Sequence, residues 1–137
     1  MATTFDTWLA ACAAAGKGGA RWIWTAMRGF KYTAVIDLDG DWTGATMAAY
    51  VRQQPDAVGD PLVTFSVTGP VVATLGGVTT SAFTFELVAG TGANSTGILP
   101  ADTDGDAVLD LPLFITITES GGSAELFAGG IMRVMGD

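Results

Sequence analysis

The strongest constraint on the fold of this chain is an alternation of apolar and polar side chains that recurs along most of its length. In one segment, Tyr32, Ala34, Ile36 and Leu38 share one face and the residues between them share the other. This period of two is typical of a half-buried strand. Similar segments follow at intervals of roughly ten residues, separated by Gly and Pro. The pattern predicts an all-β chain folded as a β-sandwich of about seven to eight strands.

Glycine pairs and Asp-Gly steps predict how the strands are joined. Asp39-Gly40 supplies the positive φ values of a tight connection, so the segments before and after it are expected to form a hairpin. Gly76-Gly77 predicts a second hairpin, and Gly129-Gly130 predicts a β-bulge in the last strand. The expected strands cover residues 21–27, 31–38, 46–53, 62–68, 71–75, 78–88, 113–118 and 124–135.

Helical periodicity is confined to the N-terminal region. Phe5, Trp8, Leu9 and Cys12 are spaced at i, i+3, i+4 and i+7, which predicts a short amphipathic helix. A helix this short needs a surface to dock on, either on its own domain or on a neighbouring subunit.

The glycine-rich segment after this helix predicts a hinge, and Trp22 and Trp24 then share one face of an extended arm. We therefore expect residues 1–27 to form an N-terminal helix, hinge and arm, and residues 28–137 to form the β-sandwich domain. The candidate interface residues are Phe5, Trp8, Leu9, Trp22 and Trp24.

Charged residues are scarce and unevenly distributed. They make up 15% of the chain, about ten points below the usual share. This indicates a surface covered by partner subunits, or else one that is simply rich in Thr, Ser and Gly. The net charge is −8, with +3 on residues 1–31 and −11 on residues 32–137. The asymmetry suits head-to-tail docking of subunits, or an isolated basic loop. No dense basic run predicts nucleic-acid binding.

The reactive side chains favour a non-enzymatic role. The chain has no histidine, which removes the commonest general base and nitrogen metal ligand. Cys12 falls on the apolar stripe of the expected helix, so we interpret it as a small buried hydrophobe. No catalytic residue and no cofactor are predicted.

Two aspartate clusters share the pattern D-x-D-G-D, at residues 37–41 and 102–106. Closely spaced carboxylates on a turn can bind Ca²⁺, although the EF-hand frame is absent. The alternative is that Asp-Gly steps simply make turns. The candidate calcium ligands are Asp102, Asp104, Asp106 and Asp110.

A single cysteine allows no internal disulfide, which fits assembly in a reducing cytoplasm. The residues before Cys12 spell a lipobox-like LAAC, but the eight residues that precede this tetrapeptide contain no Lys or Arg. An export signal is therefore not expected, and no run of ~18 apolar residues predicts a transmembrane helix.

Two segments resemble a phage virion family. They are residues 38–52 (LDGDWTGATMAAYVR) and 113–134 (LFITITESGGSAELFAGGIMRV), read as the strand after a turn and a closing hairpin. Together they are similar to the N-terminal domain of phage baseplate upper proteins and related tail proteins. That resemblance implies an immunoglobulin-like antiparallel β-sandwich that attaches receptor-binding devices to the tail, with no catalytic residues.

The expected function is thus that of a structural virion protein, an assembly or adaptor subunit in the tail or baseplate of a tailed bacteriophage. Its partners would be copies of itself in a homo-oligomeric ring and other phage structural proteins, with no nucleic acid and no membrane. It would be assembled in the host cytoplasm and reside in the virion. The alternatives are a glycan- or receptor-binding β-sandwich module, with or without calcium, and a capsid decoration or head–tail joining protein.

Overall fold

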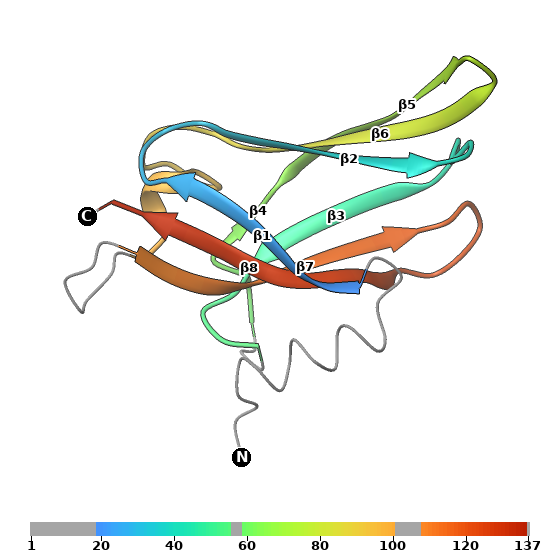
Figure 1. Cartoon of the computed structure of the whole chain (residues 1–137). Helices are drawn as coiled ribbons and strands as arrows, with labels where there is room; N and C mark the ends of the chain where they lie inside the picture. The colour runs from blue at the N-terminus through green and yellow to red at the C-terminus, as the bar shows by residue number, and fades with distance from the viewer. Residues whose placement is uncertain (1–18, 56–58, 101–107, 137) are drawn as a thin grey trace.

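The computed structural model describes residues 19–55, 59–100 and 108–136, and Figure 1 shows them as two layers of β-strands. The predicted all-β sandwich is confirmed. The predicted N-terminal helix lies outside the described residues. The described strands are β1 (Gly19–Met27), β2 (Tyr32–Asp39), β3 (Thr46–Val51), β4 (Val63–Thr64), β5 (Ser66–Leu75), β6 (Val78–Leu87), β7 (Val108–Thr118) and β8 (Glu125–Met135), with one 3-10 turn, η1 (Thr96–Ile98).

The strands form a five-stranded sheet in the order β1-β8-β7-β3-β4 and a three-stranded sheet in the order β2-β6-β5. This is the strand order of an immunoglobulin-like sandwich. In the letters used for that fold, β2, β6 and β5 correspond to strands B, E and D of one layer, and β3, β7 and β8 to strands C, F and G of the other. One pair departs from the antiparallel arrangement, because β1 runs parallel to β8. Alternation of side chains identifies strands and their faces but carries no information on direction.

The connection at Asp39-Gly40 is a crossover between the two sheets, so the predicted hairpin of β2 and β3 is wrong. Gly40 has the expected positive φ, +94°, but the chain then enters the opposite layer. The buried Ser81 hydroxyl of β6 holds the crossover: it donates to the Gly40 carbonyl (2.8 Å) and accepts from the Trp42 N–H (2.9 Å). The apolar faces of β2 and β3 therefore meet across the core instead of lying side by side.

Strand β1 is part of the sandwich, so the predicted domain boundary between residues 27 and 28 is wrong for residues 19–27. Its register with β8 runs from Gly19 opposite Ala128 to Met27 opposite Met135. At Gly130 the two backbones lie so close that an added Cβ would clash with the Trp22 carbonyl oxygen. The first described strand is thus a component of the sheet and not an arm that leaves it.

The irregularity of β8 falls beside Phe127 and not at the predicted Gly129-Gly130 pair. Ile115 pairs with Ala128 and Thr116 pairs with Leu126, which leaves Phe127 as the extra residue. The glycine at 130 instead admits the backbone of β1 at close range.

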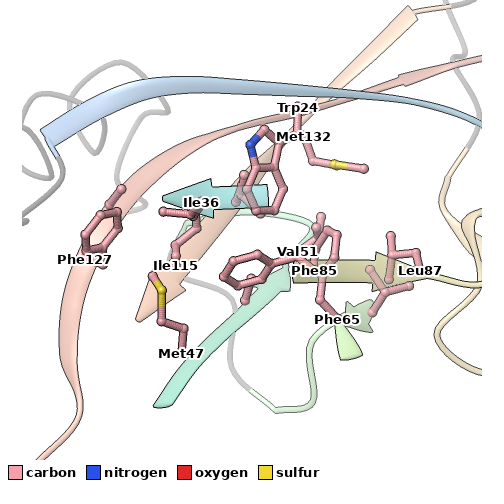
Figure 2. Close-up of a cluster of buried hydrophobic side chains, with 14 of the residues drawn as sticks. Trp24, Ile36, Met47, Val51, Phe65, Phe85, Leu87, Ile115, Phe127 and Met132 are labelled. Atoms are coloured by element: carbon pink, nitrogen blue, oxygen red, sulfur yellow. The ribbon is translucent and has the colours of Figure 1, made fainter. Parts of the chain in front are cut away.

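The core lies between the two sheets and contains a group of aromatic rings around Trp24. The ring centroid of Trp24 is 5.4 Å from those of Phe65 and Phe85, and 6.0 Å from that of Tyr32. Figure 2 shows Trp24, Phe65 and Phe85 among the side chains gathered in the core. The predicted inward faces of β2 and β3 are confirmed by the burial of Ile36, Met47, Ala49 and Val51.

Candidate functional site

The hairpin formed by β5 and β6 carries the most prominent exposed apolar surface of the described residues. It reaches past the ends of the neighbouring strands, at the upper right of Figure 1. We call residues 71–80 the projecting hairpin. Its register is regular, from Val71 opposite Ala82 to Leu75 opposite Val78.

Apolar side chains are exposed on both faces of the projecting hairpin. The buried residues of β6 are Ser81, Phe83, Phe85 and Leu87, so the alternate positions of this strand face outward. By register, Val71, Leu75 and Val78 lie on the outer face, and Val72 lies on the face that continues the core. The exposed fractions are 68% for Val71, 39% for Val72, 85% for Leu75 and 61% for Val78.

The same segment carries no charge. Between Asp60 and Glu86, the sequence contains no Asp, Glu, Lys or Arg, in a chain whose net charge is −8. At the base of the hairpin, Glu86 forms an exposed ion pair with Lys31 across to β2 (3.5 Å). The projecting part itself carries no charge, and the charged residue next to it across the sheet is Asp39, the partner of Thr80.

Strand β5 is the edge of its sheet, and the turn geometry shows which of its backbone groups point outward. Gly76 and Gly77 have φ values of +58° and +81°, as a two-residue type I′ turn requires. Such a turn is closed by a hydrogen-bonded pair, here Leu75 and Val78. Because hydrogen-bonded and non-bonded pairs alternate, the N–H and C=O groups of Val72 and Thr74 point away from β6.

This outward edge has little of the protection that edge strands usually carry. Natural edges are blunted by charged side chains, prolines or bulges. Pro70 and an adjacent register shift between Thr68 and Val71 protect the start of β5, but from Val71 onward there is no charge or proline. The segment Val71–Leu75 is thus a strand edge able to accept another extended chain.

The calcium candidates are only partly within the described residues. Asp102, Asp104 and Asp106 lie outside them. Asp110 accepts two hydrogen bonds from Arg133, from Nε at 2.9 Å and from Nη2 at 3.0 Å. The hydrogen bonds and charge of Asp110 raise the pKa of the Arg133 guanidinium. Asp110 is therefore already engaged in a bidentate ion pair on the outer face of the five-stranded sheet.

In the first aspartate cluster, Asp41 organises the crossover loop. Its carboxylate accepts hydrogen bonds from the Thr43 hydroxyl (2.5 Å) and N–H (2.9 Å). These hydrogen bonds lower the pKa of Asp41. Among residues 19–55, 59–100 and 108–136, no three His, Cys, Asp or Glu side chains gather in a way that could hold a metal ion.

Of the five predicted interface residues, two lie within the described part of the chain, and their side chains differ in exposure. Phe5, Trp8 and Leu9 lie outside the described part of the chain. Trp22 is half-buried and meets Phe127 edge-on, with ring centroids 5.7 Å apart. Trp24 is 8% exposed and lies in the core, so its side chain is not available to a neighbouring subunit.

Sequence reasoning did not single out the projecting hairpin, although a signal was present. The uncharged run of residues 61–85 coincides with it. The overall scarcity of charge indicates either a covered surface or a face rich in Thr, Ser and Gly, and it does not locate the exposed apolar side chains of the hairpin.

No pocket was found in the part of the chain that the structure describes. Nor do those residues include a helix that is long and apolar enough to cross a membrane. Comparison of the sequence with protein-family models and with curated proteins gave no match.

Proposed function

We propose that this protein is a structural subunit of a tailed bacteriophage, acting in assembly or as an adaptor in the tail or baseplate. The observation that carries the proposal is the neutral, apolar projecting hairpin on an otherwise acidic β-sandwich. The resemblance of residues 38–52 and 113–134 to the phage baseplate upper proteins and related tail proteins supports the same role.

The hairpin supports an assembly role through the hydrophobic effect. Burying a Val or Leu side chain fully is worth about 1.5–3 kcal/mol. Val71, Leu75 and Val78 are each more than half exposed, so docking on a partner would recover a large part of that free energy. Exposed apolar patches of this kind mark contact sites in soluble proteins.

In this proposal the sandwich is a rigid body and the hairpin is the contact element. The partners are copies of this chain and other phage structural proteins. Heterologous contacts through other surfaces close the copies into a ring, and the hairpin supplies a separate contact. The protein is assembled in the host cytoplasm and resides in the virion. The proposal assigns it no catalytic residue and no cofactor.

Quantitative mass spectrometry of purified virions tests this function by counting copies of the chain per particle. A small multiple of the tail symmetry is expected for a tail or baseplate subunit. A copy number in the hundreds would point to a capsid decoration protein or a tail-tube component. Absence from the particle would overturn the proposal, and glycan arrays with and without Ca²⁺ would then test the receptor-binding alternative.

A further inference from the structure

We propose that the exposed edge of β5 pairs with β5 of a second copy of this chain. The two strands run antiparallel about a two-fold axis at Ala73, and the two three-stranded sheets become one continuous six-stranded sheet. This inference rests on the proposed function, because it names the partner of an assembly subunit and the strand through which the two make contact.

Backbone geometry defines the register of this pair. The outward groups of β5 belong to Val72 and Thr74, while those of Ala73 point toward β6, where it pairs with Thr80. A two-fold axis at Ala73 places Val72 opposite Thr74 of the second copy, and Thr74 opposite its Val72. Each of these two pairs exchanges two hydrogen bonds, so every outward N–H and C=O over this stretch gains a partner.

The side chains are self-complementary in the same register. Val71 lies opposite Leu75 of the second copy on the outer face, where the two are 68% and 85% exposed in the single chain. On the other face, Val72 lies opposite Thr74. Cross-strand pairs of β-branched and aliphatic residues stabilise a sheet by roughly 0.2–1 kcal/mol each. The pairing therefore covers the apolar side chains that the hairpin exposes.

The charge distribution makes this edge a place where a second copy can dock. Two chains of net charge −8 repel each other over most of their surfaces. Residues 61–85 contain no charge, so strands paired at Ala73 bring no like charges into contact. The neutral edge also offers nothing to a partner recognised through acidic or basic side chains.

The size of the contact sets its strength. A standard stable interface uses roughly 20–30 residues from each partner. Five residues of each copy, Val71–Leu75, form the strand pair, with the hairpin tip beside them. The isolated pair should therefore be weak, with a dissociation constant on the order of micromolar or higher. Repetition in an assembled particle would strengthen it through multivalency.

A disulfide between the two copies tests the register directly. Ala73 lies opposite itself as a non-hydrogen-bonded pair, for which the Cα atoms are about 4.5 Å apart. This separation lies within the range of disulfide geometry. In a full-length Cys12→Ser background, Ala73→Cys should form covalent dimers under mild oxidation at least ten times faster than the matched control Thr80→Cys. Thr80 is the cross-strand neighbour of Ala73, but three strand spacings, about 14 Å, would separate its two copies.

A second variant is designed to block the pairing while the sandwich stays folded. Thr74→Pro deletes an outward N–H, and proline is tolerated at such positions of an edge strand. Combined with Ala73→Cys, it should lower the rate of dimer formation about tenfold, while circular dichroism stays unchanged. If Thr74→Pro perturbs the hairpin, Leu75→Asp serves the same purpose, because Leu75 is 85% exposed and the added carboxylate would face Val71 of the second copy.

Sedimentation equilibrium of the wild-type chain should show a monomer–dimer equilibrium that Leu75→Asp shifts to monomer. The inference is overturned if Ala73→Cys reacts no faster than Thr80→Cys, or if the wild-type chain stays monomeric at its highest soluble concentration. The latter result would assign the edge to a different chain. The outcome is independent of the virion count, because a chain present in particles can fail to pair, and a chain absent from particles can pair in solution.

Discussion

The two halves of the β5–β6 hairpin share a strand pattern but have opposite surroundings. In the half near the sandwich, Phe83, Phe85 and Leu87 are fully buried. In the projecting hairpin, Leu75 and Val78 are 85% and 61% exposed. Both halves alternate in the same way, and both are free of charge up to Glu86. The difference shows that alternation specifies a strand, whereas burial depends on whether the opposite layer reaches it.

Each half consequently has its own physical role. Near the sandwich, apolar side chains pack against the five-stranded sheet and contribute to the stability of the monomer. Beyond it, side chains of the same type stay exposed and contribute little to folding. Their burial would instead stabilise a contact with another chain. The following experiments test this difference between the two halves, in order of decreasing effect on stability.

The largest difference is expected between two leucines of the one hairpin. Leu87→Ala creates a cavity in the core and should lower the free energy of unfolding by about 2–5 kcal/mol. Leu75→Ala, at an 85% exposed position, should change it by under about 0.5 kcal/mol. Urea denaturation of the two variants measures both values. Equal losses would mean that the projecting hairpin is as tightly packed as the near half.

Two hydroxyls on one face of β6 provide the next comparison. The buried Ser81 hydroxyl bridges Gly40 and Trp42, so Ser81→Ala leaves two backbone groups without their partner and should cost about 1–3 kcal/mol. The Thr79 hydroxyl bonds only that of Thr74 (2.9 Å), at an exposed position. Thr79→Val is the matched control and should cost under about 0.5 kcal/mol. A small effect of Ser81→Ala would show that the crossover does not depend on this bridge.

A pH titration tests the burial of a tyrosine in the core. Burial raises the pKa of Tyr32, which packs against Trp24 and Phe65. Above the unfolded pKa of about 10, the unfolded chain releases this proton and the folded chain retains it. Stability should then fall with rising pH by up to about 1.4 kcal/mol per pH unit.

Tyr32→Phe should reduce this decline, as measured by urea denaturation between neutral pH and high pH. Tyr50→Phe removes the other tyrosine of the chain, on the opposite face of the five-stranded sheet, and should leave the decline in place. The interpretation fails if the two variants behave alike.

The smallest effect on global stability is expected at the hairpin turn. Gly77 has a φ of +81°, so Gly77→Ala should strain the turn by about 1–2 kcal/mol. Because the projecting hairpin can open without unfolding the sandwich, global stability should fall by under about 1 kcal/mol.

The strain should appear instead as roughly tenfold faster hydrogen exchange at the amides of Ala73 and Leu75, which face β6. Gly92→Ala is the control, since it has open space for a Cβ and no positive φ. A full loss of 1–2 kcal/mol in global stability would show that the turn and the core unfold as one unit.

Much of the fold could be predicted from sequence because its local rules are simple. The alternation at Met47, Ala49 and Val51 gave the buried face of β3, and Gly76-Gly77 gave the turn between β5 and β6. The partners of the strands could not be obtained in this way. The positive φ of Gly40 is compatible with a return beside β2 and equally with entry into the other layer. The parallel direction of β1 is likewise a long-range property of the sheet.

The candidate site was less predictable than the fold. Tryptophan is the interface anchor expected from sequence because it is large and apolar, but for Trp24 those same properties favour burial in the core. The exposed residues are instead valines and a leucine in an ordinary strand pattern. These residues are exposed because the hairpin is longer than the layer opposite it. No local segment of sequence encodes that difference in length.

The parallel pairing of β1 with β8 also has a consequence for the time course of folding. Trp22, near the start of the chain, has Gly130 as its partner in the sheet. Contacts between residues so distant in sequence form late and slow the folding of β-proteins. During synthesis, β1 emerges from the ribosome long before β8 exists, and no other described strand pairs with it. The five-stranded sheet is therefore completed only after the last strand has been translated.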